Sequence, residues 1–408
     1  MKKFLTLIIL AIFALAACSN ESMQTTDYTN ATWNDILADG TGTSVRMFMW
    51  GGDEGINQYM DEVIAPKLKE EYDIEFERVP MDTQNILQKL VTEKEAEKKE
   101  GTIDIIWING ENFKNAKEQS LLYGPFTDLL PNMNEYVDKQ SLDIQYDFGT
   151  KTEGFEAPWG KVQFVFLYDE ANVPEPPQSF GELLKWTNEN KGKFTYPEAS
   201  DFTGNAFLRH LLYHSVDVES LLEKGYDEAF VQKNTEEMWS YLNEIKSNLW
   251  REGQTYPKDL TELDRLYSRG EVWMTMGYNE ARAESLINEG VFPKTTKSFV
   301  LDTGSIGNTH FLAIPFNSPN KAGAMVVINH LLSPDAQLAK YEPTYWGDRF
   351  SLDLSKLPAE MQAKFNEVDR GDSVIEADQL QGKVLPEVDA EYVNWLKETW
   401  YEKVVQGK

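Results

Sequence analysis

The sequence predicts an α/β protein made of two lobes. Short apolar segments with the period of a strand alternate with longer segments in which apolar residues recur at helical spacing. A chain of 408 residues is also longer than one hydrophobic core usually supports. No Gly/Ser-rich linker separates the two halves of the pattern. We therefore expect the lobes to share a hinge that the chain crosses more than once.

The first half of the chain has the order strand, helix, strand, helix, strand. Strands are expected at residues 45–50, 74–79 and 103–108, where β-branched, aromatic and other apolar residues alternate or cluster. Helices are expected at 56–68 and 86–91, where apolar side chains recur on one face. This order is typical of an α/β sheet with right-handed crossovers.

The same alternation resumes after residue 165. Signals for a helix start, either capping-box spacing or a proline at the first helical position, occur at Ser179–Glu182, Ser318-Pro319 and Ser333-Pro334. Further helices are expected from apolar periodicity at 202–212, 238–249 and 281–287. Strands are expected at 194–196, 272–276 and 311–314.

Composition excludes several classes of protein. The chain has 67 acidic and 39 basic residues, a formal charge of −28, and no basic stripe, which argues against nucleic acid as a partner. With 41% hydrophobic and 12% aromatic residues it can bury a core, unlike a disordered acidic protein. The single cysteine, Cys18, excludes a disulfide framework and a cysteine-based metal cluster.

The N-terminus is typical of an exported lipoprotein. Lys2 and Lys3 precede an apolar stretch, 4–17, which is too short to span a bilayer comfortably and has the length of a signal segment. It ends in Leu-Ala-Ala before Cys18, which resembles the bacterial lipobox. We expect a signal peptide at 1–17, diacylation of Cys18 and a polar tether at 18–43. The alternative is an ordinary secretory signal with a chance cysteine.

Catalytic patterns are weak. His210 and His214 are four residues apart on one expected helix and could face a metal, but the intervening glutamate of the zinc proteases is missing. Tyr341 and Tyr345 differ in spacing from the adjacent tyrosines that iron binders use. No nucleophile elbow or phosphate-binding loop occurs. We expect no metal, no cofactor and no enzyme activity, with a hydrolase that uses cleft carboxylates as the alternative.

Several motifs resemble a known family. The segments 156–169 and 311–324 resemble the two inter-lobe crossings of type 2 extracytoplasmic solute-binding proteins. Trp50-Gly51-Gly52 and the motifs at 107–113, 123–127 and 194–197 resemble an uncharacterised subfamily of ABC-transporter binding proteins, related to the thiamine and iron(III) binders. The resemblance covers nearly the whole chain after the leader.

The resemblance implies the type 2 periplasmic-binding-protein fold, in which two α/β lobes joined by a hinge close on a solute. On this basis lobe 1 is expected to comprise 44–165 and 310–345, and lobe 2 to comprise 166–309 and 346–408. The implied partners are a small-molecule solute and an ABC permease in the membrane, and the implied state is a monomer.

Candidate binding residues lie where expected strands end, because ligands of open α/β sheets bind beyond the carboxyl ends of strands. Five such loops combine glycine with an aromatic, amide or carboxylate side chain. The candidate ligand-binding residues on them are Trp50, Asp53, Trp107, Asn109, Glu111, Trp159, Asp201, Phe202, Thr203, Tyr278, Asn279 and Glu280.

Aromatic faces and carboxylates favour a cationic or polar aromatic solute such as thiamine. Glycines and free amides at helix starts would instead favour an anion, but carboxylates outnumber cations on these loops, Lys161 excepted. Each residue also has a structural explanation. Asp53 and Asp201 would serve as helix caps, the asparagines as turn residues and the aromatic residues as core.

The sequence therefore predicts a lipid-anchored solute-binding component of an ABC importer, exported and held on the membrane surface. A sugar-binding protein of the same fold is the nearest alternative, since aromatic faces and carboxylates also suit sugars. A surface adhesin or lectin-like binder, which has no permease partner, is a further alternative class.

Overall fold

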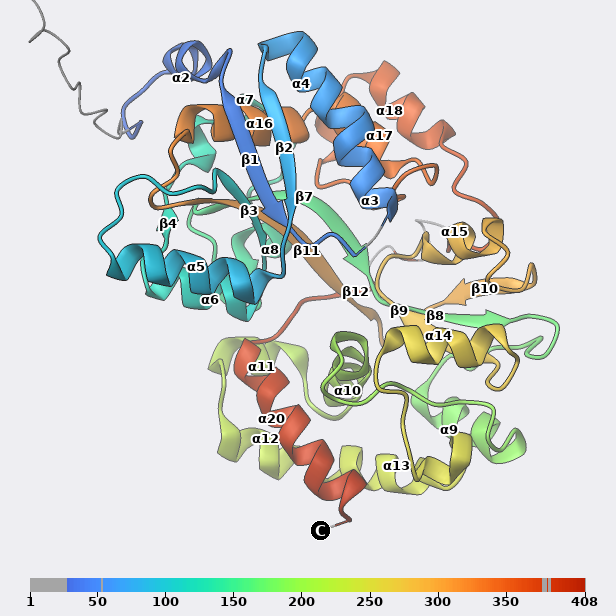
Figure 1. The fold of residues 1–408 in the computed structure, drawn as a ribbon. Coiled ribbons are helices and arrows are strands. Elements are labelled where there is room, and N and C mark those ends of the chain that lie inside the picture. The colour runs from blue at the N-terminus through green and yellow to red at the C-terminus, as the bar shows by residue number, and fades with distance from the viewer. Residues whose placement is uncertain (1–27, 53, 376–379, 381–382, 408) are drawn as a thin grey trace, which may run out of the picture.

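The computed structural model describes residues 28–407 except 53, 376–379 and 381–382. It consists of two lobes joined by strands that run from one to the other (Figure 1). The expected leader 1–17, Cys18 and Asp53 lie outside the described residues.

The first lobe contains a seven-stranded sheet with the strand order β12-β11-β3-β1-β2, in which β4 and β7 also pair with β11. β1 is parallel to β2 and β3, whereas β11 is antiparallel to β3 and β7. The three strands expected in the first half are confirmed as β1, β2 and β3. The strands are β1 (Ser44–Met49), β2 (Glu75–Pro80), β3 (Ile105–Ile108), β4 (Leu122–Tyr123), β7 (Glu156–Gln163), β11 (Ser305–Pro315) and β12 (Val384–Leu385).

Helices cover both faces of this sheet (Figure 1). Of the two proline-marked starts, Ser333 caps α17 as expected, but α16 is capped by Asn320 and not by Ser318. The helices are α2 (Trp33–Gly40), α3 (Glu54–Gln58), the π-helix η1 (Tyr59–Ile64), α4 (Ala65–Tyr72), α5 (Thr83–Glu95), α6 (Glu111–Glu118), η2 (Thr127–Leu129), α7 (Pro131–Tyr136), α8 (Leu142–Gln145), α16 (Lys321–Leu331), α17 (Pro334–Tyr341), η4 (Leu354–Lys356) and α18 (Ala359–Glu367). A small hairpin, β5 (Tyr146–Asp147) and β6 (Thr150–Lys151), follows α8.

The second lobe has a three-stranded antiparallel sheet, β10-β8-β9, surrounded by helices. Ser179 caps α9, as its capping-box spacing predicts. The strands are β8 (Val165–Asp169), β9 (Met274–Gly277) and β10 (Thr296–Phe299). The helices are α9 (Phe180–Glu189), α10 (Phe202–Ser215), α11 (Val218–Lys224), α12 (Glu228–Asn234), α13 (Glu236–Lys246), η3 (Trp250–Gly253), α14 (Leu260–Ser268), α15 (Arg282–Asn288), α20 (Ala390–Trp400) and η5 (Tyr401–Val405).

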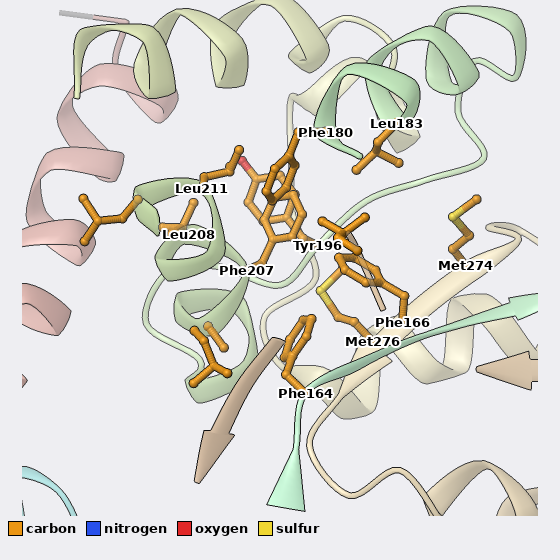
Figure 2. Close-up of a cluster of buried hydrophobic side chains, with 14 of the residues drawn as sticks. Phe164, Phe166, Phe180, Leu183, Tyr196, Phe207, Leu208, Leu211, Met274 and Met276 are labelled. Atoms are coloured by element: carbon orange, nitrogen blue, oxygen red, sulfur yellow. The ribbon is translucent and has the colours of Figure 1, made fainter. Parts of the chain in front are cut away.

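The core of the second lobe is centred on α10, which is buried along most of its length (Figure 2). The ring of Phe207 stacks on Tyr196 with 4.6 Å between ring centroids. The strand expected at 194–196 is wrong. These residues are buried, but the Phe194 carbonyl accepts a hydrogen bond from the backbone of Trp250 outside any sheet ladder. The apolar run 194–196 is therefore buried without pairing with a strand.

Long strands form the connection between the lobes. β7 pairs in the first-lobe sheet, and the chain continues through Phe164 into β8 of the second. β11 belongs to both lobes, because Ile306 at its start lies in the second core and Leu312 near its end lies in the first. The short β12 runs parallel to the start of β11. The expected hinge with several crossings is therefore present as adjacent extended segments.

Two expected boundaries differ from the structure. The tether expected at 18–43 is folded from residue 28 onward, since Tyr28 and Ile36 are buried in the first-lobe core and α2 is closed by a capping box at Thr32. The stretch after residue 345 was expected in the second lobe. Trp346 and Phe365 instead lie in the first-lobe core, and the chain joins the second core from Ile375.

Candidate functional site

A cavity of about 360 Å³ lies between the two lobes. Its first-lobe wall is formed by residues of α8 and the β5–β6 hairpin, within 142–149. The opposite wall consists of Leu222 on α11 and the segment 384–387. The part of β11 between Gly307 and Phe311, where the strand passes from one core to the other, lies between these walls. A relative movement of the lobes would therefore open or close the cavity.

Apolar side chains are unusually exposed around this cavity. Among the described residues nine large hydrophobic side chains are exposed, and four of them line it. Leu142 and Tyr146 belong to the first lobe, and Leu222 and Val384 lie opposite them. Such a concentration of exposed apolar surface is typical of a place that contacts a ligand or partner.

The loop after β3 reaches the cavity through two hydrogen bonds. The Asn109 side-chain amide donates to Oδ1 of Asn308 at 3.1 Å. The Gly110 backbone N–H donates to Oδ2 of Asp147 at 2.6 Å. Both acceptor residues line the cavity, so this predicted loop does border it. Glu111, at the start of α6, is exposed.

Arg209 connects two more predicted loops to the same cavity. Its guanidinium is buried, forms an ion pair with Glu387 and donates to the Tyr278 hydroxyl at 3.3 Å. The Tyr278 hydroxyl in turn donates to Glu387 at 3.1 Å. The guanidinium also lies 5.5 Å from the ring centroid of Phe148 and 5.7 Å from that of Phe202. Arg209 thereby holds together rings from both lobes.

Three carboxylates line the cavity, and they differ in their partners. Glu387 is paired with Arg209. Asp143 lies 2.6 Å from Lys161; burial raises its pKa, but this ammonium and the Ser141 hydroxyl outweigh burial and lower it. Asp147 accepts only the Gly110 N–H among the described groups, and burial raises its pKa to about 8.

Two predicted tryptophans lie away from the cavity lining. Trp50 is 46% exposed, and its ring lies so close over Gly52 that a Cβ there would collide with it. Trp107 is part of an aromatic cluster, with its ring centroid 4.9 Å from His310 and 5.7 Å from Trp346. Both remain candidates, but neither lines the cavity.

Other predicted residues have structural roles. Trp159 is fully buried in the first-lobe core beneath Trp107, which corrects the expectation that it presents a free face. Asp201 caps α10 by accepting from the backbone of Thr203 and Gly204. Thr203 itself is buried. The capping explanation given above for Asp201 is thus confirmed.

The loop after β9 contacts the first lobe. Asn279 has a positive φ of 68° and accepts from the Ala281 N–H, as a turn residue does. Glu280 is buried, with Arg349 Nε 3.5 Å and Arg370 Nη1 3.8 Å from its carboxylate. These contacts tie the second-lobe loop to the segment that follows α17.

The two histidines considered as metal ligands are not paired. The Nδ1 of buried His210 lies 2.7 Å from the Ala206 carbonyl, and its Nε2 accepts from the Ile306 N–H at 3.0 Å. His214 is exposed. Because the Ile306 N–H occupies Nε2, His210 serves as a link between α10 and β11.

None of the predicted site residues is among the fifteen residues that line the cavity, and of the residues that sequence reasoning missed, five matter most for its geometry and charge. Arg209 carried a signal, because it is a single charge within an otherwise apolar helical face, two turns after Phe202. The other four residues are Asp147, Phe148, Asn308 and Glu387. Their positions at the cavity depend on long-range packing, which no local sequence pattern reveals.

Comparison with known proteins identifies the family. The family described as bacterial extracellular solute-binding protein matches residues 64–364. The chain belongs to this family. The sequence-based resemblance to solute-binding proteins is thereby confirmed. This solute-binding protein is also 36% identical over 397 residues to protein YnjB of Escherichia coli (strain K12), an alignment that covers 97% of each chain.

Solved structures share the fold of this solute-binding protein. An ABC transporter from Clostridium perfringens ATCC 13124 matches with a TM-score of 0.60 at 19% identity, over 88% of this chain and 98% of the other. The spermidine/putrescine ABC transporter substrate-binding protein PotD from Streptococcus pneumoniae matches with a TM-score of 0.58 at 14% identity, over 88% and 99%. The two-lobe solute-binding fold predicted from the sequence is confirmed. Within the described part of the chain, no helix has both the length and the apolarity to cross a membrane.

Proposed function

We propose that this protein is the lipid-anchored solute-binding component of an ABC importer. Its two lobes close on a small solute, and the closed form delivers the solute to a membrane permease. The observation that carries the proposal is the cavity enclosed by both lobes beside β11, the strand they share. The names of structural relatives, two of which are ABC transporter proteins, support the transport role.

The cavity favours a cationic or polar aromatic solute, of which thiamine is an example. Tyr146 and Phe148 offer ring faces, and Asn308 offers an amide. Carboxylates line the cavity, while Arg209 is already paired with one of them. A micromolar affinity corresponds to about −8 kcal/mol, which a few ring contacts and charge-assisted hydrogen bonds supply.

A ligand screen tests this proposal. Thermal unfolding of the full chain in detergent is measured with vitamins, amines, sugars and metal salts. We expect a cationic aromatic compound to raise the melting temperature, because a ligand that binds only the folded state stabilises it. A rise with sugars alone would favour the sugar-binding alternative. Cleavage of a polymer without any ligand-induced rise would contradict the proposal in favour of a hydrolase.

A second test concerns the anchor. Replacement Cys18→Ser removes the thiol that would be acylated, so we expect the protein to move from the membrane fraction to the soluble exported fraction. Fractionation and mass spectrometry of the N-terminal peptide measure the change. The variant Ser19→Ala serves as the control and is expected to stay with the membrane. Retention of Cys18→Ser on the membrane would contradict lipid anchoring.

A further inference from the structure

One buried carboxyl group lines the cavity, and a second lies beyond the lining, where the charge of the first acts on it. Asp147 is 3% exposed and lines the cavity from the β5–β6 hairpin. Glu156, the first residue of β7, is 2% exposed, and neither of its carboxylate oxygens has a hydrogen-bond partner among the described residues. A buried carboxyl group without partners is costly, so its presence calls for a physical explanation.

The strand register places Glu156 on the same face of the sheet as Phe311, a residue of the cavity lining, although Glu156 and Ala313 opposite it lie beyond that lining. Glu156 pairs with Ala313, and Pro158 pairs with Phe311, which lines the cavity. Side chains two residues apart on a strand point to the same face, so Glu156 and Phe311 share a face. Leu312, between them in the register, points to the opposite face and into the first-lobe core.

The cations around this carboxyl pair have other partners. Lys117 on α6 attracts Glu156 only from a distance, because its ammonium donates to the Lys151 carbonyl and to Glu153. On the same wall as Asp147, Lys161 is paired with Asp143, and on the opposite wall Glu387 is paired with Arg209. Beyond these groups, the Gly110 N–H is the donor that reaches Asp147.

In the absence of a bound cation, burial favours the protonated form of the carboxyl groups of Asp147 and Glu156. Burial raises the pKa of Asp147 to about 8 in spite of the Gly110 hydrogen bond. Burial, and then the charge of Asp147, raise the pKa of Glu156 well above its usual value. At neutral pH Asp147 is therefore mainly neutral in the empty protein, and the pKa of Glu156 is shifted in the same direction.

We propose that Asp147 and Glu156 form a subsite for the protonated amine of the solute, whose apolar body lies against Leu142, Tyr146 and Leu222. This proposal rests on the proposed function and narrows its solute to amines with an apolar or aromatic body. The N–H donors of an ammonium group supply the hydrogen bonds that the oxygens of Glu156 lack. When the ammonium enters, one carboxyl group releases its proton to solvent and the charge of the site is balanced. Because binding requires this deprotonation, affinity rises as pH increases towards about 8.

Matched amine and alcohol probes test the subsite in the full chain. Calorimetric titrations compare phenethylammonium with 2-phenylethanol, and tryptammonium with 3-(2-hydroxyethyl)indole. We expect each amine to bind at least tenfold more tightly than its alcohol. Titration in two buffers of different ionisation enthalpy is expected to show release of about one proton at pH 7.

Three near-isosteric variants localise the effect. Asp147→Asn and Glu156→Gln are expected to remove the amine preference and the proton release while leaving the affinity for the alcohols unchanged. Asp104→Asn is the matched control, because its carboxyl group is also buried in the first lobe but lies outside the cavity lining, and it is expected to keep the preference. If a variant fails to fold, the affinity ratio and proton release of the unaltered protein decide alone.

The outcomes separate the subsite from the proposed function. Equal binding of amine and alcohol, or an amine preference that survives both Asp147→Asn and Glu156→Gln, would overturn the subsite and leave the solute-binding role intact. A screen that finds only ligands without a basic nitrogen would overturn it as well. Failure of every probe and of every compound in the wider screen to bind would count against the proposed function itself.

Discussion

Replacement Arg209→Met is expected to lower the free energy of unfolding by about 3–5 kcal/mol. The change removes the guanidinium but leaves Glu387, which is 8% exposed, without its counter-charge. An unpaired carboxylate in the interior costs far more than the lost ion pair contributes. Urea-induced unfolding followed by circular dichroism measures the effect.

The same substitution is expected to weaken solute binding at least tenfold. Arg209 is in cation–π contact with the rings of Phe148 and Phe202 and forms the ion pair with Glu387 in the cavity wall. The double variant Arg209→Met, Glu387→Leu is expected to recover most of the stability, because well-packed apolar residues replace a buried pair at little cost. The double variant is still expected to bind the ligand found in the screen weakly. This result would separate the role of Arg209 in the cavity from its role in folding.

Arg265 in the same lobe provides the control. Its partner is Glu262 on the same helix, and the arginine side chain is 55% exposed. Arg265→Met is expected to change stability by less than about 1 kcal/mol, since exposed pairs contribute little. A loss below about 1 kcal/mol for Arg209→Met would show that the buried pair is not needed for folding.

Replacement His210→Gln is expected to make the protein more resistant to acid. Burial lowers the pKa of His210 to about 3, whereas an unfolded histidine titrates near 6.5. Below pH 6.5 the unfolded chain therefore binds a proton that the folded chain does not, and stability falls by about 1.4 kcal/mol per pH unit. This loss reaches about 4–5 kcal/mol at pH 3.

Glutamine has a side-chain oxygen to accept from the Ile306 N–H and an amide to donate to the Ala206 carbonyl, without the titration. The measurement is the difference in unfolding free energy between the two proteins at pH 7 and pH 5, where we expect a change of about 2 kcal/mol. The raised pKa values of Asp147 and Glu156 change stability with pH in the opposite direction. Both proteins contain these two groups, so their contribution cancels when the two proteins are compared. His214→Gln, at an exposed position of the same helix, is expected to show no such change. An equal pH dependence of His210→Gln and the unaltered protein would contradict the prediction.

Features decided by neighbouring residues were predictable from the sequence. The strands β1 to β3 follow from local apolar patterns, and the caps at Ser179 and Ser333 follow from residues within one helical turn. The loops after β3 and β9 were identified because strand ends in this class of sheet point to a common region. Asn109 and Tyr278 do reach groups that line the cavity.

Features that depend on tertiary packing were not predictable. The run at 194–196 has strand-like residues, but its neighbours offer it no ladder. Trp346 and Phe365 carry apolar surface that either core would bury, so sequence alone did not decide their lobe. The pair Arg209–Glu387 likewise depends on where the last part of the chain docks.

The repeated passage of the chain between its two cores limits how such a protein diversifies. A polypeptide interrupted at any one point would leave both halves incomplete, because residues near 164, 308 and 370 each carry the backbone across. Exchange of a contiguous gene fragment with a relative therefore replaces parts of both halves at once and disrupts interior surfaces that have to match. Stepwise replacement of single residues around the cavity leaves those interiors untouched, and this is the route to a new solute that the architecture leaves open.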